Sequence, residues 1–218
     1  MGCELVVFDN DGVLVDSEPI SNRILAEYLS ELGHPTSYEE SIERYMGSAV
    51  HSIHDSVRER SGRELPTDFD EVFHGRVFEA FREELEPVDG VAEVLLALRE
   101  AGVEYCLASS GSHERIRVAL RKTGLEKFFP EGALFSADDV GRGKPAPDLF
   151  LHAAAVRGVQ AEECVVVEDS PAGVQAARSA GMDVLGFCAM TPRERLGGAR
   201  ACFSEMAELP GLLGLGSE

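Results

Sequence analysis

The sequence has little positive charge. Its 218 residues include only three lysines, and 20 lysines and arginines stand against 39 aspartates and glutamates, which gives a net charge of −19. Binding of nucleic acid needs clustered basic side chains, and no basic run is present, so we expect no nucleic-acid partner. The acidic balance still permits an anionic substrate, because salt screens exposed charges beyond roughly 8 Å.

Long apolar stretches are also lacking. No uninterrupted run of about 18 apolar residues occurs, and the N-terminus has no apolar signal segment, so we expect neither membrane spanning nor secretion. The cysteines are odd in number and widely spaced, which indicates reduced thiols and a cytoplasmic protein; they are Cys3, Cys106, Cys164, Cys188 and Cys202. We also expect a monomer or a weak homo-oligomer.

Short apolar runs are present instead, and helical patterns separate them. The run Leu5–Phe8 is typical of a strand buried on both faces. Similar runs recur at 103–108, 133–135, 164–167 and 184–187. Strands that alternate with helices predict an α/β fold built on a parallel sheet.

One long segment interrupts this alternation. Residues 16–86 have helical periodicity and no convincing strand, and a Pro- and Gly-containing stretch follows them. We therefore expect a core from residues 1–15 and 87–218, with residues 16–86 inserted as a separate helical unit.

Two aspartates end the first apolar run. Asp9 and Asp11 are two residues apart, so in an extended chain both carboxylates lie on one face. Ligands of parallel sheets bind at the carboxyl ends of strands, which is where this pair falls. An acidic turn that merely caps the strand is the alternative.

A second acidic pair follows the run 164–167. Glu168 and Asp169 can reach one ligand only if the strand has already turned at Glu168. Together with Asp9 and Asp11 they would offer the hard oxygen ligands that Mg²⁺ prefers. The alternative is a helix N-cap with an exposed acid beside it.

Hydroxyl groups follow the apolar run 103–108. Ser109 and Ser110 precede a helical stretch that begins near His113, and hydroxyls with backbone N–H groups at a helix start can hold phosphate oxygens. Ser112 as an ordinary N-cap is the competing interpretation.

Lys144 lies in the loop Gly141-Arg142-Gly143-Lys144-Pro145. A nucleotide-binding P-loop needs Ser or Thr after the lysine, and Pro145 excludes it. Because the protein otherwise uses arginine for positive charge, we infer that this loop presents the compact ammonium group of Lys144 at a functional site. A solvated loop lysine is the alternative. In the insertion, Arg44, His51 and His54 are weaker candidates for contacts with the substrate.

Four separated stretches together resemble the haloacid dehalogenase superfamily. They are Asp9-Asn10-Asp11-Gly12 with the following residues to Glu18, Ser109, Lys144-Pro145, and Glu168-Asp169-Ser170-Pro171-Ala172-Gly173, in the family's order and spacing. The resemblance implies a Rossmann-like core with a helical cap.

The resemblance also implies roles for these residues. Asp9 would be the nucleophile that forms an aspartyl-phosphate, and Asp11 the acid that protonates the leaving oxygen and later activates water. Asp9, the Asp11 carbonyl and Asp169 would hold Mg²⁺, with Glu168 as a fourth candidate. Lys144, Ser109 and Ser110 would neutralise and bind the phosphoryl oxygens. Apart from the resemblance, we expect the cap to close over the substrate, with Arg44, His51 and His54 as candidates for contacts with the leaving group.

Within this family, the residues at three positions favour a phosphatase that acts on a small sugar or sugar-acid phosphate. The second acid, Asp11, is typical of phosphate-ester hydrolysis, and Ser21 and Val50 stand where beta-phosphoglucomutases have a histidine and an arginine. A phosphosugar mutase is the first alternative. A receiver-like module that keeps a phosphorylated aspartate as a signal is the second, and the long insertion and Asp11 both argue against it.

Overall fold

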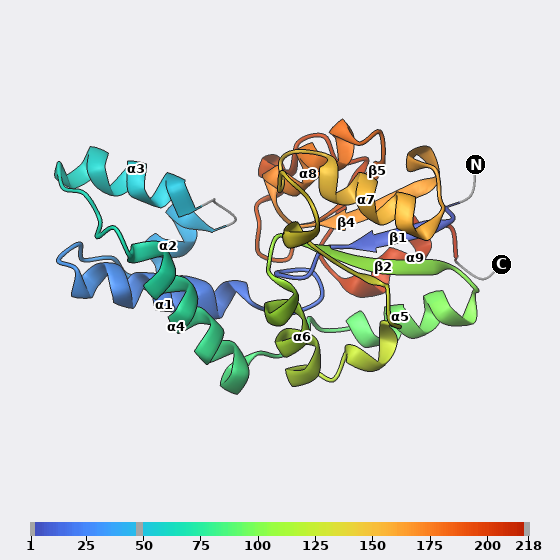
Figure 1. The fold of residues 1–218 in the computed structure, drawn as a ribbon, viewed down its shortest axis with the longest axis horizontal. Coiled ribbons are helices and arrows are strands. Elements are labelled where there is room, and N and C mark those ends of the chain that lie inside the picture. The colour runs from blue at the N-terminus through green and yellow to red at the C-terminus, as the bar shows by residue number, and fades with distance from the viewer. Residues whose placement is uncertain (1–2, 47–49, 216–218) are drawn as a thin grey trace. The chain divides into compact units, whose positions relative to one another are not determined.

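The computed structural model describes residues 3–46 and 50–215 (Figure 1). The chain divides into two compact units. A core unit comprises the chain as far as Asp16 and from Glu86 onward, and a helical unit comprises Ser17–Leu85.

The core unit contains a parallel sheet of six strands in the order β3-β2-β1-β4-β5-β6. The α/β fold expected from the sequence is confirmed. The strands are β1 (Leu5–Phe8), β2 (Glu104–Ser109), β3 (Leu134–Ser136), β4 (Cys164–Glu168), β5 (Asp183–Phe187) and β6 (Ala201–Phe203).

Helices cover both faces of this sheet. In Figure 1, α5 and α6 lie on one side and α7 and α8 on the other, as right-handed crossovers between parallel strands require. The core helices are α5 (Val91–Glu100), α6 (His113–Lys122), α7 (Asp148–Arg157), α8 (Pro171–Ser179) and α9 (Leu209–Leu212). Single 3₁₀ turns lie at Glu126–Phe128, Ala137–Asp139, Ala161–Glu163, Arg193–Leu196 and Met206–Glu208.

Strand β1 lies at the centre of the sheet, and all four of its side chains are buried. It pairs with β2 through Val7 opposite Cys106 and with β4 through Val7 opposite Val166. The carboxyl ends of β1, β2 and β4 therefore lie next to one another, and Asp9, Ser109 and Glu168 lie at these ends.

The helical unit is built from α1 (Glu18–Glu31), α2 (Tyr38–Tyr45), α3 (Val50–Ser61) and α4 (Phe69–Glu84). Its interior includes a stacked pair, Tyr28 and Phe69, whose ring centroids are 5.1 Å apart. Ser37 and Glu40 form a capping box that starts α2. Apolar periodicity and capping together explain why this segment folds as helices.

The five cysteines are all free thiols, as the sequence analysis predicts. Within the described residues, no helix has both the length and the hydropathy that a transmembrane span needs.

Candidate active site

Asp9 follows β1 directly and is fixed at the centre of the sheet. Its backbone N–H donates to the carbonyl of Val167 at 3.0 Å, which continues the ladder between β1 and β4 by one residue. The residue is 7% exposed. The Asp9 carboxylate is therefore held at the carboxyl end of the sheet by the same pairing that forms the core.

The loop between β3 and α7 brings Lys144 to Asp9. The Lys144 Nζ donates to Asp9 Oδ1 at 2.6 Å, to Glu168 Oε1 at 2.7 Å and to the Ala108 carbonyl oxygen at 3.1 Å. The side chain is only 4% exposed. One ammonium group thus joins the ends of β1, β2 and β4, and Lys144 is no solvated loop residue.

Glu168, the last residue of β4, is fixed by the start of α8. Its Oε2 accepts hydrogen bonds from the Ser170 backbone N–H at 2.8 Å and from the Ser170 hydroxyl at 2.9 Å. Ser170 also caps α8, because its Oγ accepts from the Gly173 N–H at 3.0 Å. With Oε1 on Lys144, the buried Glu168 carboxylate has partners at both oxygens.

Three carboxylates converge at this point. Oxygens of Asp9, Glu168 and Asp169 lie within 4.8 Å of one another, and all three residues are buried. The strand ends at Glu168, which lets two consecutive acids reach one place. Gly12 makes room for Asp169, since a Cβ at Gly12 would overlap that carboxylate. A buried set of hard oxygen donors fits a divalent cation such as Mg²⁺.

The electrostatics of the site are dominated by burial and by excess negative charge. Burial, helped by Glu168 and Asp11, raises the pKa of Asp9 to about 7 despite the nearby ammonium of Lys144. Burial lowers the pKa of Lys144, but Asp9 and Glu168 outweigh it and raise this pKa above the usual lysine value. One lysine does not balance the carboxylates, which favours a further cation here.

Asp11 lies on the same loop and is bound by a residue that the sequence analysis missed. The Arg115 Nη2 donates to Asp11 Oδ1 at 2.8 Å, and Asn10 Nδ2 donates to Asp11 Oδ2 at 3.2 Å. The Asp11 and Arg115 side chains are 23% and 22% exposed. The available signal was a basic residue in the first turn of the helix that follows the hydroxyl-rich strand end.

The loop after β2 separates the two predicted serines. Ser109 is buried, and its Oγ accepts from the Gly111 N–H at 3.0 Å. Ser110 is exposed. Ser112 caps α6, because its Oγ accepts from the Arg115 N–H at 3.3 Å. The N-cap interpretation of Ser112 is confirmed, and phosphate binding by Ser109 and Ser110 stays a prediction.

The remaining candidates belong to the helical unit. Arg44 is exposed and lies 3.8 Å from Glu40. His54 Nε2 contacts Asp70 Oδ1 at 2.7 Å. The side chain of His51 lies outside the described residues. Contacts of Arg44, His51 and His54 with a substrate stay predictions.

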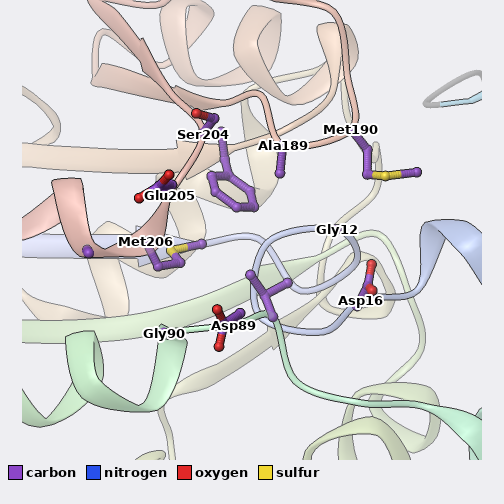
Figure 2. A pocket seen from close by; sticks show the side chains of 12 residues that line it. Gly12, Asp16, Asp89, Gly90, Ala189, Met190, Ser204, Glu205 and Met206 are labelled. Atoms are coloured by element: carbon purple, nitrogen blue, oxygen red, sulfur yellow. The ribbon is translucent and has the colours of Figure 1, made fainter.

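A cavity of about 530 Å³ opens beside Gly12 in the core unit (Figure 2). Its lining combines apolar side chains such as Met190 with the acids Asp16, Asp89 and Glu205. This lining contains no basic side chain that could bind a phosphate group, whereas the neighbouring cluster contains Lys144.

Comparison with known proteins agrees with this geometry. The model of the haloacid dehalogenase-like hydrolase family matches residues 3–181. The 6-phosphogluconate phosphatase of Escherichia coli (strain K12) is 36% identical over 187 residues, which cover 85% of this chain and 83% of that protein. Hexitol phosphatase A of the same strain is 32% identical over 197 residues, or 90% of this chain and 88% of that protein.

A solved structure extends the similarity to the whole fold. A conserved haloacid dehalogenase-like protein of unknown function from Agrobacterium tumefaciens str. C58 superposes with a TM-score of 0.89 at 36% identity, covering 98% of both chains. The chain belongs to the haloacid dehalogenase-like hydrolase family. Within that family it is a phosphoric monoester hydrolase, which replaces the interpretation as a signalling module.

Proposed function

We propose that this protein is a Mg²⁺-dependent phosphatase of a small phosphorylated metabolite, a sugar or sugar-acid phosphate, and that Asp9 is its nucleophile. The contact of Lys144 Nζ with Asp9 Oδ1 at 2.6 Å is the observation that carries the proposal. The substrate class is supported by the relatives named 6-phosphogluconate phosphatase and hexitol phosphatase A.

In the first step, an Asp9 oxygen attacks the phosphorus and the ester P–O bond breaks. The leaving oxygen takes the proton of Asp11, which gives a free alcohol and an aspartyl-phosphate on Asp9. Lys144 keeps Asp9 in place and offsets the negative charge that gathers on the phosphoryl oxygens. Ser109 and backbone N–H groups of its loop bind those oxygens.

In the second step, the Asp11 carboxylate accepts a proton from water, and the water oxygen attacks the phosphorus. The bond between phosphorus and Asp9 breaks, which releases inorganic phosphate and restores the Asp9 carboxylate. Asp11 then carries the proton for the next cycle. Splitting the hydrolysis in this way replaces one difficult displacement by two easier ones.

The residues that would hold Mg²⁺ are the Asp9 and Asp169 carboxylates and the Asp11 carbonyl, with Glu168 as a fourth candidate. Bound there, the ion would neutralise charge on the phosphoryl oxygens and orient them. The three-carboxylate cluster within 4.8 Å supports this assignment.

The test is a screen of the purified protein against sugar phosphates, sugar-acid phosphates and nucleotides, with and without Mg²⁺, and with release of inorganic phosphate as the readout. Asp9→Asn should lower turnover at least about a thousandfold with every substrate. Asp148→Asn, which removes an acid paired with Arg142 at the protein surface, is the control and should retain activity. Turnover by Asp9→Asn near the wild-type rate would overturn the proposal.

The same screen separates hydrolysis from mutase activity. A phosphatase releases inorganic phosphate and needs no bisphosphate, whereas a phosphosugar mutase returns an isomer of the substrate and needs a bisphosphate intermediate. We expect the first result, because Ser21 and Val50 stand where beta-phosphoglucomutases have a histidine and an arginine.

A further inference from the structure

The last residue of β3, Ser136, binds the loop that carries Ser109. The two serines are paired in the register between β2 and β3, and Ser136 is fully buried. The Ser136 hydroxyl donates to the carbonyl oxygen of Gly111 at 2.7 Å, and the Gly111 N–H donates to Ser109 Oγ at 3.0 Å. Both backbone polar groups of Gly111 are therefore bound by serine hydroxyls.

This arrangement leaves the hydroxyl proton of Ser109 for a ligand. A serine hydroxyl has one proton to donate and two lone pairs that accept. Among the described residues, the Ser109 hydroxyl accepts a hydrogen bond from Gly111 and donates none. Ser109 can therefore donate to a phosphoryl oxygen while the Gly111 N–H fixes the orientation of its side chain.

The hydrogen bonds of the Ser136 hydroxyl have only one possible direction. A carbonyl oxygen can only accept, so the Ser136 proton points to Gly111, and the Asp138 N–H donates to the same hydroxyl oxygen at 3.1 Å. The C=O and N–H groups of a planar trans peptide point in opposite directions. By holding the Gly111 carbonyl, Ser136 therefore also fixes the direction of the Ser112 N–H.

The turn that follows β3 holds the same loop at a second point. Asp139 Oδ1 lies 2.8 Å from His113 Nε2, and His113 is the first residue of α6, directly after the loop. An ionised carboxylate only accepts, so His113 Nε2 carries the proton of this hydrogen bond. Asp139 Oδ2 accepts from the Ser136 backbone N–H at 2.8 Å. The Asp139 carboxylate thus joins the end of β3 to the start of α6.

The same turn lies beside the segment that carries Lys144. A Cβ built on Gly143 would lie 3.8 Å from Ala137 Cβ, so the backbone next to Lys144 packs against the turn. Lys144 Nζ also donates to the carbonyl of Ala108, the residue before Ser109, at 3.1 Å. The turn therefore supports both the loop of Ser109 and the segment of Lys144.

We propose that Ser136 and Asp139 are positioning residues, which hold the Ser109 loop in the conformation that binds the transferred phosphoryl group. This inference rests on the proposed function and deepens it. Ser136 is fully buried and contacts the loop backbone, and Asp139 contacts His113, so both residues act through the loop. Every substrate carries the phosphoryl group that this loop binds, so loss of either residue should affect all substrates by the same factor.

The experiment compares Ser136→Ala with Ser41→Ala. Each variant removes a buried hydroxyl that donates one hydrogen bond, and the Ser41 hydroxyl donates to Asn22 Oδ1 at 3.0 Å within the helical unit. The two variants should lose similar amounts of stability in urea unfolding. Only Ser136→Ala should lower kcat/KM, roughly 10- to 100-fold, and by the same factor for 4-nitrophenyl phosphate and 6-phosphogluconate. It should also raise the inhibition constant of orthovanadate, a mimic of the transferred phosphoryl group, about tenfold or more.

Variants of the Asp139 contact test the second point of attachment and also decide the question if Ser136→Ala does not fold. His113→Ala and Asp139→Ala should each weaken inhibition by orthovanadate, and the double variant should lose no more than either single variant, because one contact is removed in all three. His113→Gln keeps an N–H donor for Asp139 and should restore most of the inhibition.

Three results would overturn the inference: equal kinetics in Ser136→Ala and Ser41→Ala, a loss confined to one of the two substrates, or additive losses in the double variant of His113 and Asp139. Absence of Asp9-dependent phosphate release by the wild type from every substrate would instead remove the proposed function, and this inference with it.

Discussion

The Glu168 carboxylate occupies the space where a side chain at residue 173 would begin. A Cβ on Gly173 would overlap the carboxylate group of Glu168. The same carboxylate holds Lys144 at 2.7 Å through Oε1, and Lys144 holds Asp9. A glycine in the first turn of α8 is thereby connected to Asp9 through the side chains of Glu168 and Lys144.

Gly173→Ala should displace Glu168 and with it Lys144. A displacement of about 1 Å in a catalytic group can cost a hundredfold in rate, so we expect turnover to fall by roughly that factor. Overpacking should also destabilise the fold by about 1–3 kcal/mol. Steady-state kinetics and urea unfolding measure both effects.

Gly211→Ala is the matched control for that substitution. Gly211 lies in α9 of the same unit, and a Cβ at this residue would meet no atom within 4 Å, so alanine fits there. We expect unchanged turnover and a gain in stability of up to about 1 kcal/mol. Full activity in Gly173→Ala would show that Glu168 does not fix Lys144.

Removal of the Lys144 charge should destabilise the protein as well as inactivate it. Lys144→Met leaves the buried carboxylates of Asp9 and Glu168 facing each other without a cation, and breaking a buried ion pair from one side costs about 3–5 kcal/mol. Chemical denaturation in the presence of a chelator measures the loss. The exposed Lys127 provides the control, since Lys127→Met should leave stability nearly unchanged. A Lys144→Met protein as stable as the wild type would contradict the claim that the Lys144 ammonium stabilises the buried Asp9 and Glu168 carboxylates.

Mg²⁺ should stabilise the folded protein and be required for turnover. A ligand that binds only the folded state at a hundred times its Kd adds about 2.7 kcal/mol. Thermal unfolding with a chelator and with added Mg²⁺ measures this shift, and Asp169→Asn should reduce it strongly. Identical unfolding and activity under both conditions would contradict the assignment of the three-carboxylate cluster as a metal site.

Acid should remove the contribution of Asp139 to the free energy of unfolding. Burial raises its pKa, but hydrogen bonds from His113 and Ser136 outweigh burial and lower it below the usual 3.8. Because the folded-state pKa is the lower one, the stabilisation is present above pH 3.8 and is lost as the pH falls through the folded value. Because Asp139 is exposed and solvent screens its contacts, Asp139→Asn should cost less than about 1 kcal/mol of folding free energy near neutral pH, and progressively less in acid.

Denaturation curves of the wild type and Asp139→Asn between neutral and acid pH measure this difference. Its neighbour Asp138, which is exposed, provides the control as Asp138→Asn. A difference that stays constant as the pH falls would contradict the role of the ionised Asp139 carboxylate.

The sequence predicts the central strands of the sheet well, because fully buried parallel strands are continuous apolar runs. Leu5–Phe8 is predicted with its observed bounds. Strand β6, Ala201–Phe203, is not predicted, since three residues at the edge of a sheet carry too weak a pattern. Helix ends are predictable where caps are local: a serine followed by proline is typical of a helix start, and α8 does begin at Pro171 after Ser170.

The site is predictable where it follows strand ends and unpredictable where it depends on long-range contacts. The convergence of Asp9, Glu168 and Asp169 follows from the rule that ligands bind at the carboxyl ends of parallel strands. The ion pair of Asp11 with Arg115 joins residues 104 positions apart. No local sequence pattern predicts that ion pair, because the two side chains meet only in the folded chain.

Rapid acid quenching of the enzyme during turnover, followed by mass spectrometry of its peptides, tests the central claim most directly. The account predicts one phosphoryl group on the peptide that contains Asp9, present during turnover, lost when substrate is exhausted, and absent in Asp9→Asn. A phosphoryl group on another residue, or hydrolysis at the normal rate by Asp9→Asn, would contradict it.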